Sequence, residues 1–294
     1  MQKVIPHLWF DGQAKEAVEL YTSLFEDSRI LDIMTIIGTP SGDTKMIDFK
    51  LANLTLSAID GGPYFTFNSS ISFMVSCSTK EEVDRLYEKL SPHGKELMPL
   101  GEHPFSKWYV WLEDQYGLGW QLMLVEDINE HVRIRPVLLF SDDVCGKAKD
   151  AMEYYSSVFK DSSIGFVNYY ASGEAPDERA KINYAEVNLG EIQWIFMDHG
   201  FGGDTSFNEA ISFIVNCENQ EEIDYFWDKL SFVPEAEICG WVKDNYHLSW
   251  QIVPSNFNDI YKHGTKEEIE RVTKAFMSMK KFDLAELERA RLGK

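Results

Sequence analysis

One stretch of the chain occurs twice, and this repetition limits the folds that the sequence can adopt. Residues 111–124 read Trp-Leu-Glu-Asp-Gln-Tyr-Gly-Leu-Gly-Trp-Gln-Leu-Met-Leu, and residues 241–254 read Trp-Val-Lys-Asp-Asn-Tyr-His-Leu-Ser-Trp-Gln-Ile-Val-Pro. In each copy an aspartate precedes turn-forming residues and then an apolar run, which is typical of a β-hairpin. We therefore predict two equivalent hairpins, each with one amide, Gln121 or Gln251, among hydrophobic residues.

Two further blocks recur in the same order. The pattern of residues 5–25 returns at 135–159, and that of residues 68–91 returns at 208–231. Repetition in register over this length indicates a tandem duplication, with length changes confined to loops. We predict a first domain at 1–130, a second at 133–255 and a C-terminal tail at 256–294.

Each repeat has the same order of short strands and single helices. Alternating or continuous apolar runs predict strands, and apolar residues at helical spacing predict helices. In the first repeat the strands fall at 4–10, 30–37, 46–52, 54–60, 70–77, 95–100, 107–113 and 118–125, and the helices at 13–26 and 79–91. The chain is therefore an α+β protein in which a strand-helix-strand-strand-strand unit occurs four times.

The C-terminal tail does not follow this order of elements. Residues 266–280 carry apolar side chains at helical spacing, and a second short helix follows Asp283, which is a suitable N-cap. Two amphipathic helices of this kind pack on the second domain or on a partner chain. We favour packing on the same chain.

Charge and cysteine content exclude several classes of function. The net charge of −20 repels nucleic acid and anionic membranes, and no basic cluster offsets it. No apolar run is long enough to span a membrane and no signal peptide is evident, so we expect a cytoplasmic protein without a nucleic-acid or membrane partner. Cys77 and Cys217 lie at matching places in apolar strands and are expected to be buried thiols.

The repeated units resemble a known family. Trp-Phe-Asp-Gly at 9–12, Asn-Glu-Ala-Ile-Ser-Phe at 208–213 and Trp-Gln-Ile-Val-Pro at 250–254 are similar to the PhnB-like branch of the vicinal oxygen chelate superfamily, also called the glyoxalase/bleomycin-resistance fold. The resemblance implies tandem domains, each built from two βαβββ units that form a curved mixed sheet around a cavity. It implies no single reaction, because members of the superfamily include isomerases, oxygenases and antibiotic-sequestering proteins.

The PhnB-like branch is often labelled a 3-demethylubiquinone methyltransferase. The sequence shows no Gly-rich strand-to-helix turn followed by an acidic residue that would suit a nucleotide-derived methyl donor. We therefore judge methyl transfer unlikely, and the sequence leaves open whether the protein is an enzyme.

The metal ligands that the resemblance implies are absent from their usual places. In metal-dependent relatives a histidine begins the first strand of a unit and a glutamate lies on the last. Here these positions fall near Ile5, at Ser70 or Ser72, and at Gln121 and Gln251. A neutral amide binds a hard divalent cation far more weakly than a carboxylate does. We expect no cofactor, although a divalent metal stays possible, with His7 and His199 as weak candidate ligands.

Several residues are candidates for contact with a small-molecule ligand. Strand periodicity puts His7 and Trp9 on one face and turns Trp120 away from Gln121. We predict that one cavity wall holds His7, Trp9, Gln121 and Met123, and that Gln251 and Trp194 serve the second domain. Asp60, Asp198 and His199 precede paired glycines and fit turns better than ligands, while a cluster of His199 with Asp198 and Glu186 is a remote alternative.

Three functions remain open on these grounds. The first is metal-free binding or sequestration of a small molecule in an aromatic-lined cavity. The second is a divalent-metal-dependent lyase, isomerase or oxygenase with non-standard ligands. The third is a scaffold whose acidic surface and tail mediate assembly. We favour the first, in a monomer or weak homodimer, and the sequence does not identify the ligand.

Overall fold

The computed structural model describes residues 2–39 and 42–294, and all of their side chains except those of residues 261 and 262. The first repeat contains β1 (Val4–Phe10), α1 (Ala14–Leu24), β2 (Arg29–Thr39), β3 (Gly42–Leu51), β4 (Leu54–Asp60), β5 (Ile71–Cys77), α2 (Lys80–Leu90), β6 (Lys95–His103), β7 (Ser106–Glu113) and β8 (Gly119–Leu124). A 3₁₀ turn at Glu130–Val132 leads into the second repeat. The predicted elements of the first repeat are confirmed, with boundary differences of a few residues.

The second repeat follows the same plan until its last unit. It contains β9 (Ile134–Phe140), a 3₁₀ turn at Asp142–Val144, α3 (Ala148–Val158), β10 (Ser163–Tyr169), β11 (Ile182–Leu189), β12 (Ile192–Asp198), β13 (Ile211–Cys217), α4 (Gln220–Leu230), a 3₁₀ turn at Pro234–Ala236, β14 (Trp241–Lys243) and β15 (Ser249–Pro254). The tail adds α5 (Asp259–His263), α6 (Lys266–Phe276) and α7 (Leu284–Leu292). The short helix α5 was not predicted.

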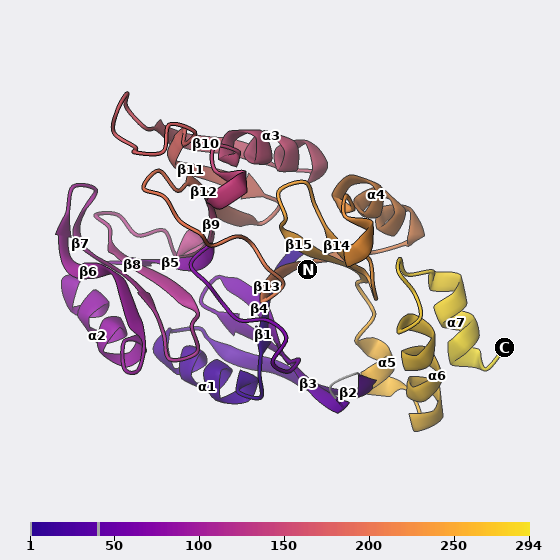
Figure 1. The fold of residues 1–294 in the computed structure, drawn as a ribbon. Coiled ribbons are helices and arrows are strands. Elements are labelled where there is room, and N and C mark those ends of the chain that lie inside the picture. Colours follow the sequence, from indigo (N-terminus) through magenta and orange to yellow (C-terminus); the bar gives the residue numbers. More distant parts are fainter. Residues whose placement is uncertain (1, 40–41) are drawn as a thin grey trace.

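The strands form two curved mixed sheets (Figure 1), so the α+β class is confirmed. The first sheet has seven strands in the order β14-β15-β13-β1-β4-β3-β2, and the second has eight in the order β10-β11-β12-β9-β5-β8-β7-β6. The centre of each sheet is an antiparallel pair of strands from different repeats, β1 with β13 and β5 with β9. Each sheet thus combines one unit of each repeat, whereas the sequence suggested that both units of one repeat would share a sheet.

The fourth unit is shorter than the other three. Trp111 follows Leu90 by 21 residues, whereas Trp241 follows Leu230 by only 11. The long β6–β7 hairpin of the second unit therefore has no full counterpart, and only the 3₁₀ turn and the three-residue strand β14 stand in its place. The prediction of three full strands after every helix was wrong here because the fourth unit lacks the residues to form them.

The two repeated hairpins are confirmed, and a buried aspartate organises each turn. Asp244 Oδ1 accepts backbone hydrogen bonds from Tyr246 and Leu248, at 2.8 and 3.0 Å. Its Oδ2 accepts from Tyr155 Oη at 2.6 Å and from Trp250 Nε1 at 2.7 Å. Asp114 makes the same four bonds in the other hairpin, to Tyr116, Leu118, Tyr21 and Trp120. A single carboxylate thus links the turn to the helix of the preceding unit.

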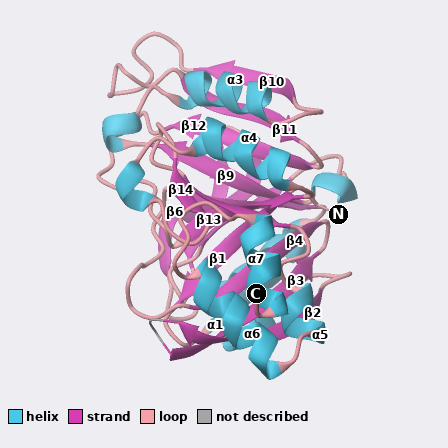
Figure 2. Ribbon diagram, turned by 90° about the vertical axis from the view of Figure 1, so that its right-hand side faces the viewer, coloured by secondary structure: helices cyan, strands magenta, loops and turns pink. Residues whose placement is uncertain are grey.

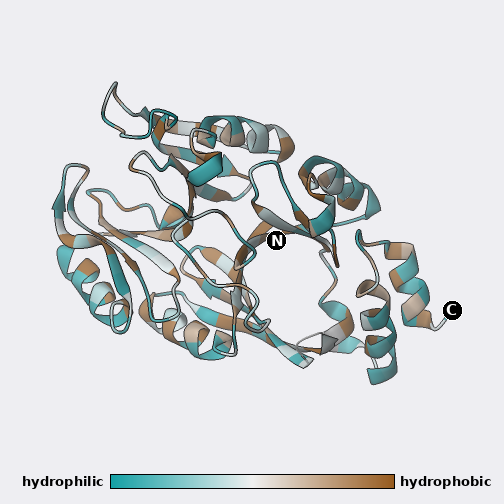
Figure 3. Cartoon of the chain, viewed as in Figure 1, coloured by the Kyte–Doolittle hydropathy of each residue, from teal (hydrophilic) through white to brown (hydrophobic). Residues whose placement is uncertain are grey.

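The hydrophobic core lies between the sheets and the helices that cover them. Figure 3 shows hydrophobic residues, in brown, distributed along both the strands and the helices. Trp120 is only 1% exposed and packs against Tyr21 of α1, with 5.1 Å between ring centroids, so its predicted orientation toward the helices is confirmed. Cys77 and Cys217 are buried free thiols as expected, and burial raises the pKa of each to about 12.

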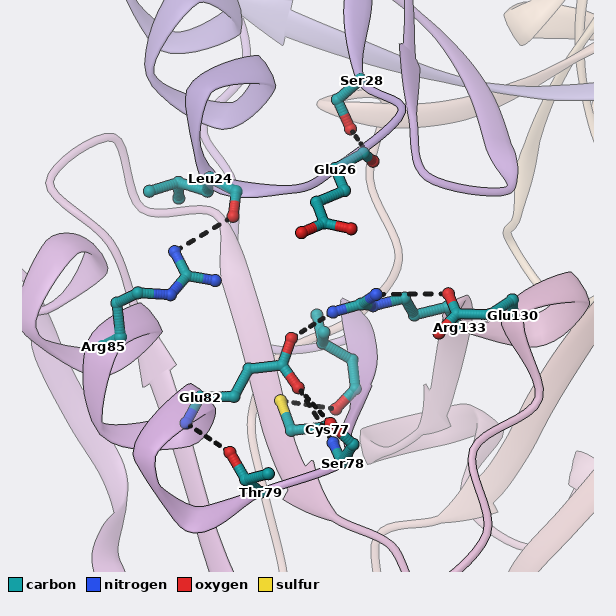
Figure 4. Close-up of polar contacts among 11 residues, drawn as sticks. Leu24, Glu26, Ser28, Cys77, Ser78, Thr79, Glu82, Arg85, Glu130 and Arg133 are labelled. Atoms are coloured by element: carbon teal, nitrogen blue, oxygen red, sulfur yellow. Dashed lines mark hydrogen bonds and ion pairs between the residues drawn. The ribbon is translucent and has the colours of Figure 1, made fainter.

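An ion pair anchors the junction between the repeats (Figure 4). Arg133 lies just before β9 and bonds both Glu130, at 3.2 Å, and Glu82 of α2. The same Glu82 accepts from the backbone N–H of Ser78, at 2.9 Å. Arg133 and Glu82 have side chains only 12% and 14% exposed, so solvent screens this contact less than it screens a surface pair.

The tail packs on its own chain, as favoured from the sequence. Figures 1 and 2 show α5 and α6 beside the β2 edge of the first sheet. The amide of Gln220 in α4 bonds the backbone at Phe282 and Leu284, and Asp283 caps α7 as predicted. No helix in the described part of the chain is long and apolar enough to cross a membrane.

Candidate functional site

A cavity of about 490 Å³ lies against the first sheet, where the tail faces β1 and β15. This volume suits a small organic molecule. Most of the lining side chains are apolar or aromatic. They come from β1, β3, β13, β14, β15 and the tail, and include Ile5, His7, Trp9, Met46, Asp48, Ile214, Trp241, Gln251, Val253, Phe257, Phe276, Met277 and Phe282.

His7 lies in the floor of this cavity at the centre of the first sheet. Its ring is 2% exposed, and its Nδ1 lies 3.4 Å from Ser212 Oγ on the paired strand β13. The ring also meets Trp241 edge-on, with 6.0 Å between centroids. Burial lowers the pKa of His7 to about 3, because the charged imidazolium would lose its hydration. The imidazole is therefore neutral throughout the physiological range.

This burial predicts a specific dependence of stability on pH. His7 has a lower pKa in the folded chain than in the unfolded chain, so the unfolded chain binds more protons as the pH falls below about 6.5. The contribution of the neutral His7 ring to stability is therefore fully present above about pH 6.5 and is lost as the pH falls toward 3. Replacing His7 by valine, the residue at the matching position 137, should remove this dependence. Between pH 7 and 5 the wild-type chain should lose roughly 2 kcal/mol more than the variant in urea unfolding. Equal losses in the two proteins would contradict the buried neutral ring.

The two glutamines of the repeated hairpins differ in one contact. Gln251 Nε2 donates to Ser212 Oγ at 2.9 Å, and Gln121 Nε2 donates to Ser72 Oγ, also at 2.9 Å. In the second sheet Tyr109 Oη completes the arrangement by donating to Gln121 Oε1 at 2.7 Å. Among the residues that the structure describes, no side chain or backbone group donates to Gln251 Oε1. This carbonyl oxygen is an acceptor within the cavity lining.

Two tryptophans, Trp9 and Trp241, contribute to the aromatic part of the wall. Trp9 donates from Nε1 to the carbonyl of Gly62 at 2.7 Å, and its ring lies 6.2 Å from that of Trp241. Gly61 permits this position, since a Cβ there would lie 2.2 Å from the ring of Trp9. Trp194, which we predicted to contact a ligand, does not form part of the wall. It is fully buried on the core face of β12, with its ring centroid 4.4 Å from that of Phe213.

The predicted single wall of His7, Trp9, Gln121 and Met123 is wrong. His7 and Trp9 belong to the first sheet, whereas Gln121 and Met123 belong to the second. The reason is the pairing of β1 with β13 and of β5 with β9, which places the hairpin of the opposite repeat next to each first strand. Gln251 is therefore the glutamine that shares a cavity with His7.

The matching face of the second sheet is occupied by its own side chains. Arg135, which corresponds to Ile5, is 5% exposed. Its guanidinium bonds Glu186 Oε1 at 3.0 Å, Gln193 Oε1 at 3.1 Å and Tyr184 Oη at 3.2 Å. These contacts lie where the first sheet has the apolar Ile5, so the two faces are built differently although the fold repeats.

Asp60 and Asp198 have structural roles, but not the local turn roles that we predicted, because each binds the backbone of another element. Asp60 accepts from the backbone N–H of Ala14 at 2.7 Å, and Asp198 accepts four backbone N–H groups, those of Gly146, Ala148, Lys181 and Ile182. The cluster of His199, Asp198 and Glu186 does not form. Glu186 pairs with Ile195 across the ladder, and Asp198 lies three residues further along the strand and thus on the opposite face.

The donor set of the cavity does not fit a divalent metal. The lining holds the single imidazole of His7, the neutral amide of Gln251 and the carboxylates of Asp48, Glu209 and Glu235. Glu209 is paired with Lys243 at 2.7 Å, and Asp48 accepts from the amide of Asn258 at 3.2 Å. Within residues 2–39 and 42–294, no three His, Cys, Asp or Glu side chains lie close enough to hold an ion. A divalent cation requires several charged or imidazole ligands in one place.

Sequence reasoning missed two parts of the site. It did not assign Trp241 to the cavity of His7, because that contact depends on which repeat supplies the neighbouring strand. It also gave the tail no part in the lining, although Phe257, Phe276 and Phe282 all contribute. The deletion before Trp241 was the available signal, since a shortened hairpin leaves a cavity edge for another segment to cover.

Comparison with known proteins supports this architecture. The profile of the 3-demethylubiquinone-9 3-methyltransferase family matches residues 2–123 and again residues 132–253. A PhnB protein from Bacillus cereus is 40% identical over 42% of this chain and all of its own, with a TM-score of 0.40. Glyoxalase I from Zea mays is 9% identical over 85% of this chain and 91% of its own, with a TM-score of 0.53. No curated protein matches.

The likeness to glyoxalase I concerns the fold alone, because the identity is so low. The family profile is more informative, since its two matches coincide with the two repeats and together cover most of the chain. The chain therefore belongs to the 3-demethylubiquinone-9 3-methyltransferase family, as a tandem form with the glyoxalase fold.

Proposed function

We propose that this protein binds a small, partly aromatic molecule in the cavity of the first sheet without using a metal ion. The observation that carries the proposal is the composition of the wall. Two tryptophans, several phenylalanines of the tail and aliphatic strand residues line the cavity together with His7 and Gln251, and Ser212 contacts both of these polar side chains. Ligand sites in proteins typically combine a large apolar surface with a few orienting polar groups.

The polar group favours binding and orientation over proton transfer or metal chemistry. A histidine with a pKa of about 3 stays unprotonated at neutral pH and is a weak base. Gln251 has no charge to lose or gain. The second sheet supports the same interpretation. There Arg135 and Tyr109 make polar contacts within the chain, and the first sheet has no such contacts at the matching positions, where we place the ligand.

Binding can be tested with small aromatic probes and a variant that fills the cavity. Indole, benzyl alcohol and 4-methylanisole should bind the full chain with micromolar to millimolar affinity in ligand-detected NMR and calorimetry. Ile5→Arg copies the residue that occupies the matching position in the second sheet, and should abolish binding by filling the cavity. Lys45→Arg, on the exposed face of β3, is the matched control and should bind normally.

Metal dependence is tested in the same experiment. Excess EDTA should leave the affinities unchanged, and elemental analysis of untagged protein should find less than stoichiometric metal. About one tightly held ion per chain, whose removal abolishes binding, would contradict the proposal and favour a metal-dependent enzyme. Failure of every probe to bind would contradict it as well.

A further inference from the structure

The second sheet contains a side chain in the place that a ligand would take in the first. Tyr109 is 3% exposed and donates its phenolic hydroxyl to Gln121 Oε1 at 2.7 Å. Its ring meets Phe105 and His103 edge-on, at centroid distances of 4.9 and 5.4 Å. A neutral phenol among aromatic rings, donating to a buried amide, is therefore a complete arrangement within this chain.

The matching place in the first sheet has no tyrosine. Trp111 pairs with Gln121 and Trp241 pairs with Gln251, so the counterpart of Tyr109, two residues before the tryptophan, is Cys239. Cys239 has a positive φ of 49° and belongs to the turn that replaces the long hairpin. Its thiol lies 3.7 Å from the carbonyl oxygen of Met277 in the tail. No phenol thus reaches Gln251 from this position.

The polar atoms that would meet a phenol are nevertheless retained. Gln251 is 9% exposed and is held by Ser212 as Gln121 is held by Ser72. Its Oε1 accepts no hydrogen bond from the residues that the structure describes, so it is available to a donor on a ligand. His7 adds a second group, because its Nε2 has no hydrogen-bond partner among the described residues and, when Ser212 donates to Nδ1, carries the ring proton. Phe276 and Phe282 of the tail supply aromatic surface in the same lining.

We infer that the ligand of the first cavity is a phenol, whose hydroxyl donates to Gln251 Oε1 as Tyr109 donates to Gln121. A phenolic oxygen can also accept a hydrogen bond, and His7 Nε2 is a donor in the same cavity lining. This inference rests on the proposed function and gives its ligand a chemical class. An aromatic ether of the same shape lacks the donor and leaves the amide oxygen unpaired.

The test compares 4-methylphenol with 4-methylanisole on the full chain by calorimetry. Loss of one hydrogen bond to a buried acceptor is expected to weaken binding of the ether about tenfold or more. Gln251→Leu should lower the affinity for 4-methylphenol to that of the ether and leave the ether unaffected. Gln121→Leu, in the second sheet, is the matched control and should retain the tenfold preference.

The two proposals fail in different ways. If both probes bind the wild-type chain equally well, the phenol inference is wrong and the aromatic cavity stands. If Gln251→Leu keeps the preference for 4-methylphenol, the hydroxyl is recognised elsewhere and the inference is also wrong. If neither probe binds, the phenol inference is overturned, and the proposed function is overturned with it when indole and benzyl alcohol also fail to bind. The comparison of probes on the wild-type chain needs no variant, so it holds even if Gln251→Leu does not fold.

Discussion

Replacement of Asp244 by alanine is expected to lower the free energy of unfolding by at least about 4 kcal/mol. The carboxylate accepts four hydrogen bonds, from Tyr155 Oη, Trp250 Nε1 and two backbone N–H groups, and it is fully buried. Alanine would leave these donors without partners, and each unpaired buried donor costs about 1–3 kcal/mol. Urea unfolding, followed by tryptophan fluorescence and by far-ultraviolet circular dichroism, measures the loss.

A nearby surface aspartate gives the control for this effect. Asp143 pairs with His247 at 3.6 Å, and its side chain is 58% exposed. Asp143→Ala should change stability by no more than about 0.5 kcal/mol, because exposed pairs contribute little. In a double-mutant cycle, Tyr155→Phe should cost less in the Asp244→Ala background than in the wild type. A loss below about 1 kcal/mol for Asp244→Ala would show that the turn does not depend on its carboxylate.

Most of the fold could be predicted from the sequence because local patterns determine local structure. Alternation and helical spacing located β1, α1 and β5 to within one or two residues, and the duplicated hairpins were evident from their aspartates and tryptophans. The partner of each central strand was not predictable in this way. β1 could join β5 or β13 with similar apolar strands on either side, and the choice decides which repeat supplies the neighbouring hairpin.

The candidate site was predicted only in part for the same reason. His7 and Trp9 were assigned to one cavity by strand parity, which holds whatever the neighbouring strand is. Gln121 was assigned to the wrong cavity because its position depends on the long-range pairing. The buried Arg135 was also overlooked, since a lone arginine in an apolar strand gives no sign of the glutamate, glutamine and tyrosine that surround it.

Replacement of Phe282 by alanine is expected to cost about 3–5 kcal/mol of stability, the usual range for a buried phenylalanine. Phe282 is 2% exposed and stacks on Phe257, with 5.5 Å between ring centroids. It also lies against Gly240, where a Cβ would approach its ring to 2.7 Å. The backbone next to it pairs with the shortened hairpin, since Cys239 and Gly240 donate to the carbonyls of Met279 and Lys280.

These contacts indicate that the tail replaces the long hairpin which the fourth unit lacks. If so, Phe282→Ala should lower the stability of the second repeat and also lower the affinity for 4-methylanisole, because the same ring supports the turn and lines the cavity. Leu292→Ala, at an exposed position near the end of α7, is the control and should leave both unchanged. Urea unfolding and calorimetry measure the two effects. A stable Phe282→Ala protein with normal binding would show that the first sheet closes its cavity without the tail.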